Sequence, residues 1–141
     1  QLLPLQGTVL ITVAEHDRAG ALEVARRFTG IGFSIVATDG TRKYLAANGV
    51  AASPILKMHE GRPNIADAIT NGEIHLVVNT PAGKASVHDD SYIRKAAIKH
   101  KVPYITTTAA AIAAAKGIEA VRKKGHSAVK SLQQYHASLS G

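Results

Sequence analysis

Polar and cationic residues follow the apolar runs of this sequence at nearly every point where a run ends. The residues at these points can hydrogen bond to an anion or neutralise it: Arg18, Thr38, Gly40, Thr41, Lys57, Asn79 and Thr80. Hydroxyl groups, a glycine turn and a helix N-terminus together favour negative charge, because unpaired N–H groups and the helix dipole both attract anions. The chemistry that this pattern predicts is the binding of an anion.

Three of these residues also have an ordinary structural interpretation. Thr41 is suited to cap the helix that follows Gly40, Lys57 to be a solvated surface lysine, and Asn79 to form a turn. Their convergence on one rim of the predicted fold favours the binding interpretation over the three separate ones.

Several other chemistries lack the residues that they need. Cysteine is absent, which excludes thiolate catalysis and cysteine-ligated zinc. The pairs His59–Glu60 and His88–Asp89 have neither a helical i,i+4 partner nor a cysteine, so we expect no metal site. No GxGxxG follows the first apolar run and no GxxxxGK[ST] occurs, which excludes dinucleotide and Walker-type sites. We expect no catalytic constellation and no resident cofactor in this chain.

The charge of the chain also indicates an anionic partner. Its 17 Lys and Arg residues exceed its 10 Asp and Glu residues, for a net charge of +7. Charge alone leaves nucleic acid, nucleotide, phosphate and acidic lipid open. Aromatic residues make up 4% of the chain and tryptophan is absent, which argues against stacking on RNA or single-stranded DNA. A generic basic interaction module rests on the net charge only.

Five apolar runs alternate with amphipathic stretches and must position these residues. The runs predict strands over residues 9–14, 33–38, 50–56, 74–79 and 102–106. The stretches after them predict helices that begin near residues 17, 41, 65 and 89, and a last helix over 108–124. Such alternation predicts an α/β fold, a three-layer, five-stranded, mainly parallel sheet flanked by helices. Ligands of such sheets bind outside the carboxyl ends of the strands, where the polar residues lie.

The length of 141 residues predicts one domain. Residues 1–6 resemble the end of a linker, residues 7–141 form the domain, and the order of residues 125–141 is left open. No apolar run is long enough to span a membrane and no export leader is recognisable, so we expect a cytoplasmic protein without a membrane partner. The chain starts at Gln1 without methionine, as expected of a piece of a longer protein.

Six short motifs carry a resemblance to a known family. They are GTVLITV from Gly7, ATDGT from Ala37, KMHEGRP from Lys57, NGE from Asn71, VNT from Val78 and IRK from Ile93. In this order and spacing they resemble the C-terminal regulatory domain of the carbamoyl-phosphate synthase large subunit, a methylglyoxal-synthase-like domain. The resemblance covers about residues 7–134.

The resemblance implies a regulatory domain with a five-stranded parallel sheet and no step of carbamoyl phosphate synthesis. It implies a nucleotide monophosphate effector, UMP or IMP, with ornithine acting near a neighbouring domain. The implied phosphate cradle is Thr12, Thr38, Thr41, Lys57 and Thr80, with Arg18 and Asn79 beside it, and Asp89 placed to accept hydrogen bonds from ribose hydroxyls. Thr38, Thr41, Lys57 and Asn79 are also reached from the rim argument alone.

The resemblance also implies partners and a parent activity. The partners are the remainder of the synthase large subunit and its glutaminase small subunit. The parent is an ATP-dependent, glutamine-hydrolysing ligase of pyrimidine and arginine biosynthesis, with ATP and Mg²⁺ bound only in its synthetase domains.

Three positions depart from the family pattern. Thr12 stands where serine is common, which keeps the hydroxyl, and Arg18 replaces a lysine, which keeps the charge but makes it a planar fork. Pro81 stands where a second threonine can follow the Asn-Thr pair, so one hydroxyl is lost.

The same fold also houses methylglyoxal synthase, a phosphate-eliminating lyase, which is the alternative function. That chemistry needs carboxylates at the rim to move protons beside a carbonyl. The loop that contains Glu60 lacks the aspartate of that enzyme, and Thr80 stands where it has another. His88 matches its histidine, but without the carboxylates it is not expected to catalyse the reaction.

Overall fold

The described part of the chain forms one sheet of five parallel strands in the order β3-β2-β1-β4-β5. The computed structural model describes residues 3–57, 60–80 and 87–140, without the side chains of residues 87–89 and 125–140. The strands are β1 (Thr8–Thr12), β2 (Ser34–Ala37), β3 (Ser53–Pro54), β4 (Leu76–Asn79) and β5 (Tyr104–Ile105). The parallel α/β fold predicted from the sequence is confirmed.

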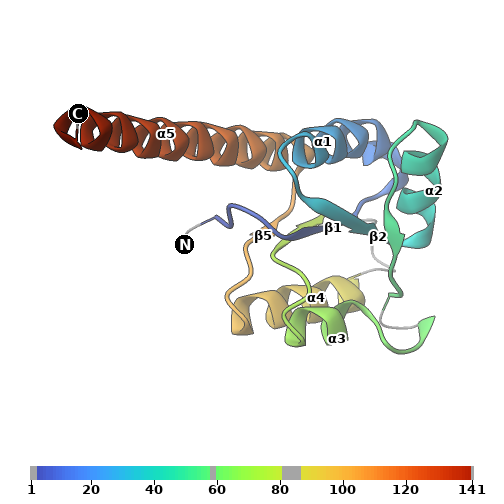
Figure 1. Ribbon diagram of the computed structural model, residues 1–141. Helices are drawn as coiled ribbons and strands as arrows, with labels where there is room; N and C mark the ends of the chain where they lie inside the picture. Colours follow the sequence, from blue (N-terminus) through green and yellow to red (C-terminus); the bar gives the residue numbers. More distant parts are fainter. Residues whose placement is uncertain (1–2, 58–59, 81–86, 141) are drawn as a thin grey trace.

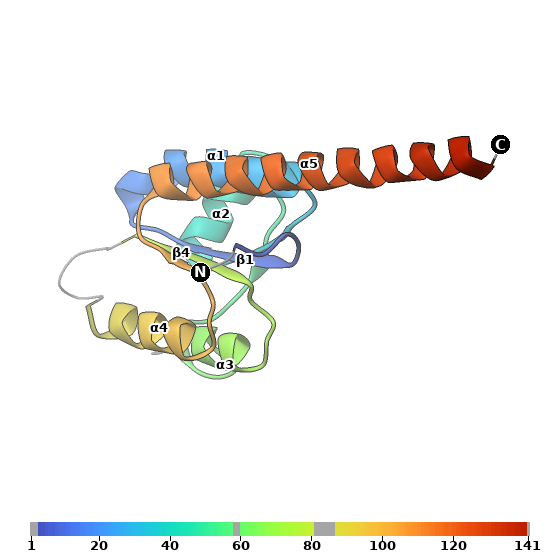
Figure 2. The same ribbon diagram turned by 90° about the vertical axis from the view of Figure 1, so that its left-hand side faces the viewer.

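Helices cover both faces of this sheet, which makes three layers. They are the short 3-10 turn η1 (Glu15–Asp17) and the helices α1 (Arg18–Gly30), α2 (Asp39–Ala47), α3 (Ile65–Thr70), α4 (Val87–Lys99) and α5 (Thr108–Ser140). Helices α1, α2 and α5 lie on one face, and α3 and α4 lie on the other (Figures 1 and 2). Each face of the sheet is therefore sealed from water by its own helices.

The apolar residues of β1 alternate between two cores. Val9 and Ile11 pack with residues of α1, α2 and α5, such as Phe28. Leu10 packs on the opposite face with residues of α3 and α4, such as Ile69. Because successive side chains of a strand point to opposite faces, a continuous apolar run is what a strand buried on both faces requires.

The two edge strands are shorter than the apolar runs predict. The prediction for residues 50–56 is reduced to Ser53–Pro54, and that for residues 102–106 to Tyr104–Ile105. Pro54 lies within the first of these strands and Pro103 precedes the second, and proline has no N–H to donate to a neighbouring strand. Both strands lie at the edges of the sheet, as the prolines predict.

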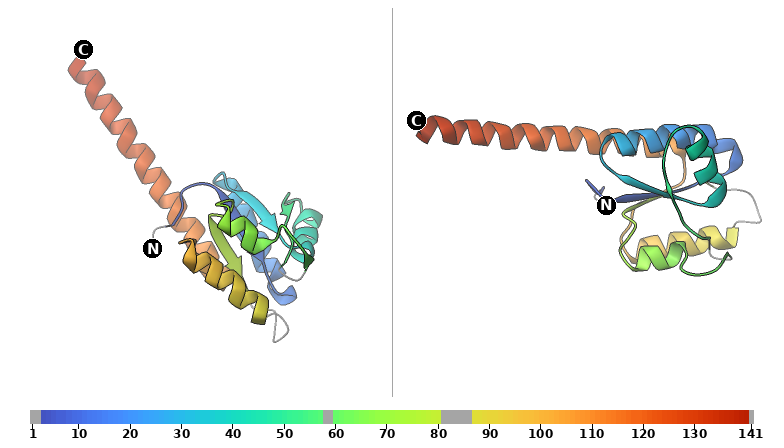
Figure 3. Two further views of the ribbon diagram at one scale, coloured as in Figure 1. Left: turned by 90° about the horizontal axis from the view of Figure 1, so that it is seen from below. Right: turned by 45° about the vertical axis from the view of Figure 1, so that its right-hand side comes forward.

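Helix boundaries differ from the predictions in three places. Helix α2 begins at Asp39 rather than near Thr41, and α4 begins at Val87 rather than near Asp89. Helix α5 does not end near Lys124 but continues to Ser140, past the edge of the sheet (Figure 3). It contacts α1 over its first half, where Arg122 donates a hydrogen bond to the carbonyl of Ile31. None of the helices in the described residues combines the length and apolar character that crossing a membrane requires.

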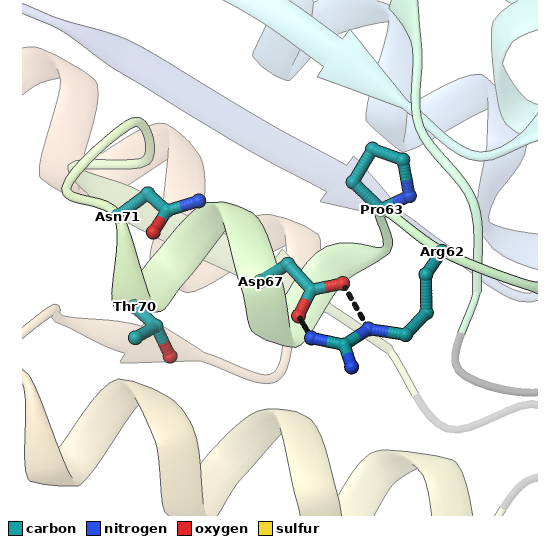
Figure 4. Close-up of a pocket in the computed structure, with 5 residues that line it drawn as sticks. All are labelled: Arg62, Pro63, Asp67, Thr70 and Asn71. Atoms are coloured by element: carbon teal, nitrogen blue, oxygen red, sulfur yellow. Dashed lines mark hydrogen bonds and ion pairs between the residues drawn. The ribbon is translucent and has the colours of Figure 1, made fainter.

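The N-terminus of α3 is closed by a reciprocal capping box. The Asn64 side chain accepts hydrogen bonds from the backbone N–H groups of Ala66 and Asp67, and the Asp67 carboxylate accepts one from the Asn64 N–H. Arg62 also donates two hydrogen bonds to that carboxylate, at 2.6 and 3.2 Å (Figure 4). Hydrogen bonds from Arg62 and Asn64 to the charged form hold the pKa of Asp67 below its ordinary value.

We expect replacement of Asp67 by Asn to lower the free energy of unfolding at neutral pH and to weaken its dependence on acid. Because the pKa of Asp67 is lowered on folding from its ordinary 3.8, its stabilisation is complete above that value. The stabilisation is lost as the pH falls through the folded-state pKa. Urea unfolding of both proteins from about pH 7 to about pH 2 measures the difference. A difference that grows toward acid would contradict the assignment.

Candidate functional site

The carboxyl ends of β1 and β4 meet where the direction of the fold reverses. These strands are neighbours in the centre of the sheet, and their register pairs Thr12 with Asn79. The chain leaves β1 toward α1 on one face and leaves β4 toward α4 on the other (Figure 1). A crevice opens between strands whose crossovers diverge, and ligands of parallel α/β proteins bind there. The topology thus selects this end of β1 and β4 as the candidate site.

Buried polar side chains concentrate at this same point. Among the described residues, the buried polar side chains at the carboxyl ends of β1, β2 and β4 are Thr12, Thr38, Thr41, Asn79 and Thr80. None of the five is more than 7% exposed, and each belongs to the predicted site. Asn64, the other buried polar residue of the described chain, caps α3. Burying a polar group is unfavourable unless it is hydrogen bonded, so these five need defined partners.

The four threonines at this point form specific hydrogen bonds. Thr38 Oγ1 donates to Thr12 Oγ1 across β1 and β2, at 2.9 Å. The backbone N–H of Ala14 donates to Thr80 Oγ1 at 2.9 Å, and that of Val13 donates to Thr41 Oγ1 at 3.3 Å. The segment after β1 is therefore held by hydroxyls from the first turn of α2 and from the end of β4, which fixes the position of its backbone.

Thr41 is not the cap of α2. Thr38 occupies the N-cap position but makes no side-chain capping bond, and Thr41 lies in the first turn with its hydroxyl on Val13. The first N–H groups of a helix have no partner within the helix, and they carry partial positive charge. Of the two interpretations of Thr41, the structure excludes the simple cap.

Arg18 lies over the start of α2. A Cβ atom built on Gly40 would be 2.4 Å from a terminal guanidinium nitrogen of Arg18, so only glycine leaves room for this arrangement. The Nε of Arg18 is shielded from solvent and has no hydrogen-bond partner among the described residues. A cation with an unused donor beside an uncapped helix N-terminus is a favourable environment for an oxyanion.

Asn79 links the site to α4 and β5. Its Nδ2 donates to Asp90 Oδ1 at 3.0 Å and to the Tyr104 hydroxyl at 2.9 Å. Burial raises the pKa of Tyr104 above its ordinary value, with the hydrogen bond from Asn79 acting in the opposite direction. Asn79 is thus a bridging residue and not the simple turn former that the sequence also allowed.

Asp90 and Tyr104 are absent from the predicted site. In the sequence, Asp90 contributes only to a helix start and Tyr104 only to a strand. A tyrosine among apolar strand residues is a weak indication of a buried polar contact, because its hydroxyl needs a polar partner when it is buried. No sequence pattern identifies that partner.

The remaining predicted site residues are only partly placed. Lys57 follows β3 toward the same rim, and its backbone N–H donates to Glu60 at 2.7 Å. No ion pair or hydrogen bond joins its ammonium group to another described residue. Asp89 belongs to α4, but its side chain and that of His88 lie outside the described residues, as do His59 and Pro81. No cluster of His, Asp or Glu that could hold a metal occurs in the described part of the chain.

A separate hollow of about 730 Å³ lies between β3 and α3. Its lining is mainly apolar, with Ile55, Leu56 and Ala68 among its residues, and it contains no cation and no residue of the predicted site. An anion has no favourable partner there, so the hollow is not the candidate site.

The comparisons with known sequences give consistent relatives. Residues 20–106 match a family model described as the MGS-like domain. The carbamoyl phosphate synthase large chain of Archaeoglobus fulgidus is 50% identical over 95% of this chain, which spans 12% of that relative. The C-terminal section of the Aquifex aeolicus large chain is 47% identical over 95% of this chain, which spans 26% of it. This chain therefore covers a minor part of the relatives that it matches.

Solved structures support the fold. A methylglyoxal synthase from Elizabethkingia anophelis matches with a TM-score of 0.64 and 19% identity, over 80% of this chain and 79% of that one. The structure of ForH matches with a TM-score of 0.56 and 15% identity over the same shares. At this identity the likeness is one of fold alone.

We expect replacement of Thr38 by Val to destabilise the fold by about 1–3 kcal/mol, because it leaves a buried hydroxyl of Thr12 without its partner. Replacing both threonines by Val removes both polar groups and costs less than the sum of the single replacements. Urea unfolding of the four proteins gives the coupling energy. Additive losses in the free energy of unfolding would show that the two hydroxyls do not interact.

Proposed function

Because this chain belongs to the MGS-like domain family, we propose that it is a regulatory domain that binds a phosphorylated nucleotide effector at the carboxyl ends of its strands. We further propose that it acts within a carbamoyl phosphate synthase large chain, as the names of its relatives suggest. There the effector would tune glutamine- and ATP-dependent carbamoyl phosphate synthesis. Such coupling is reciprocal, so substrates of the synthase would also alter effector affinity.

One observation carries this proposal: the guanidinium of Arg18, whose Nε has no partner among the described residues, lies beside Gly40 at the uncapped start of α2, where Thr38 and Thr41 of the buried threonine cluster also lie. Cation, helix N-terminus and hydroxyls are the groups that bind a phosphate. The threonine hydroxyls are held in place by hydrogen bonds of the fold itself, so they require little ordering when the phosphate binds. Lys57 adds a second cation at the same rim.

The other parts of the proposal follow from the same assignment. The rest of the large chain and a glutaminase subunit are the proposed protein partners, and a nucleotide monophosphate is the proposed small-molecule partner. ATP and Mg²⁺ would bind elsewhere in the synthase, in the cytoplasm. This domain would contribute no catalytic residue, and its pathways would be those of pyrimidines and arginine.

We expect UMP or IMP to raise the thermal stability of this chain, and inorganic phosphate to raise it less. Ornithine is tested in a separate experiment. A ligand at about a hundred times its dissociation constant adds about 2.7 kcal/mol to the free energy of unfolding. No stabilisation by any nucleotide or by phosphate at millimolar concentration would overturn the proposal. Conversion of dihydroxyacetone phosphate to methylglyoxal by this chain would assign it instead to the lyases.

We expect replacement of Gly40 by Ala to weaken phosphate and nucleotide binding about tenfold while changing the free energy of unfolding by less than about 1 kcal/mol. The added methyl group displaces only the flexible end of Arg18, and alanine is otherwise favoured in a helix. Isothermal titration calorimetry measures the affinity and urea unfolding the stability.

Gly117 in α5 provides the matched control, because a Cβ atom there meets nothing within 4 Å. Its replacement by Ala should leave ligand affinity unchanged. Equal affinities of the Gly40→Ala and wild-type proteins would remove Arg18 from the binding site.

A further inference from the structure

Two Asn-Gly pairs end helices of this fold in nearly the same way. Asn48 is the C-cap of α2 and Asn71 is the C-cap of α3, and the glycines that follow them have φ of 85° and 75°. The backbone N–H groups of Gly49 and Gly72 each donate to a carbonyl of the last helical turn at 3.1 Å. The two pairs therefore share both their residue types and a left-handed helix ending.

An asparagine before glycine can react with its own backbone, and asparagine is among the thermolabile residues for this reason. The glycine nitrogen attacks the side-chain carbonyl carbon, so a C–N bond forms, the bond to Nδ2 breaks, and ammonia leaves with the proton of the attacking nitrogen. Water then opens the cyclic imide at either carbonyl, which gives aspartate or isoaspartate. Glycine favours the attack because it has no Cβ to obstruct it. The net change is from an amide to a carboxylate, without oxidant or reductant.

The helix ending must open before this ring can close. A ψ of 18° at Asn48 and of 2° at Asn71 places the glycine nitrogen over the backbone nitrogen of the asparagine, whereas ring closure requires it over Cβ. Helix ends open locally without global unfolding. The backbone hydrogen bonds that close the two endings match, so a difference in opening must come from other contacts.

Asn48 has two additional hydrogen bonds that oppose this opening. Its Nδ2 donates to the carbonyl of Tyr44 at 2.9 Å, and its own backbone carbonyl accepts from Arg26 at 3.2 Å. Among the described residues, no hydrogen bond is made by the Asn71 side chain or accepted by its backbone carbonyl. Asn71 is exposed and lines a hollow of about 450 Å³ together with Asp67 (Figure 4).

We propose that Asn71 is a site of spontaneous deamidation in the folded protein, and that Asn48 is protected by its two additional hydrogen bonds. A hydrogen bond of ordinary strength changes an equilibrium about fivefold, and the one from Arg26 is exposed. The reactive open form is therefore about tenfold more populated at Asn71 than at Asn48. The hollow contains no residue of the proposed effector site, so the inference is independent of the proposed function.

Deamidation places a negative charge where the fold disfavours it. The new carboxylate lies at the C-terminal end of α3, where the helix dipole favours cations. It also follows Asp67 by four residues, and like charges at this spacing destabilise a helix. Arg62 already donates two hydrogen bonds to Asp67, so a second carboxylate competes for the same guanidinium. We therefore expect the modification to weaken α3.

The test is prolonged incubation of the folded chain in mildly alkaline buffer, followed by peptide mapping. Trypsin cuts after Lys57 and places the two asparagines on different peptides, in which mass spectrometry measures the modified fraction. We expect Asn71 to be modified about tenfold faster than Asn48. In the chain unfolded by guanidinium chloride, we expect the two rates to agree within about threefold, because only the Asn-Gly sequence then acts.

Two kinds of variant control the comparison. Arg26→Ala removes one protecting bond, and we expect it to raise the rate at Asn48 about two- to fivefold while the rate at Asn71 stays unchanged. Asn71→Gln keeps the amide but would have to close a larger ring, so we expect it to block the modification. Asn71→Asp reproduces one product, and we expect it to unfold at a lower urea concentration than Asn71→Gln.

Equal rates at the two sites of the folded chain, or a faster rate at Asn48, overturn the inference. A tenfold ratio that persists in the unfolded chain also overturns it, because the difference would then belong to the local sequence. Equal urea midpoints of Asn71→Asp and Asn71→Gln would overturn the expected effect on α3.

Discussion

The burial of β1 on both faces is the constraint on which the rest of the structure depends. Val9, Leu10 and Ile11 are fully buried, and no water reaches the backbone between them. Such a strand needs a hydrogen-bonded neighbour on each edge and helices on each face. The chain meets this need by placing β2 and β4 on either side and by sending the crossovers after β1 and β4 to opposite faces. The reversal of crossover direction at their carboxyl ends, where the candidate site lies, is part of that arrangement.

The same burial makes the site rigid before any ligand arrives. Where β1 ends, the backbone of Val13 and Ala14 still lies inside the protein, and hydroxyls from α2 and from the end of β4 satisfy it. Threonines suit this place because a β-branched side chain fits a strand end and its hydroxyl completes a buried hydrogen bond. The structural roles and the proposed binding roles therefore fall on the same side chains, and five of the six buried polar residues of the described chain gather at one point.

Most of the fold could be predicted from the sequence, because strands and helices follow from local periodicity. Ile11, for example, belongs to a short continuous apolar run and Val24 to a pattern of period 3.6, and neither needs knowledge of distant residues. The boundaries of the strands and helices were less predictable from the sequence. Proline shortens β3 and β5, and the backbone of α5 continues past Lys124 to Ser140, beyond the edge of the sheet. Five site residues, Thr12 and Asn79 among them, proved to be buried together, whereas the side chain of Asp89 is outside the described residues.

By itself, the sequence determined the fold class, the order of its elements and the set of residues at the strand ends, because these depend on residue type and local spacing. Only the tertiary structure decided how those residues face one another. Thr80 reaches the backbone of Ala14 across 66 positions, and Arg18 reaches Gly40 between two helices. The orientation of the Asn79 amide depends on a carboxylate and a hydroxyl from separate elements. Hydrogen-bond direction is set by the partner in space, and no local pattern records that partner.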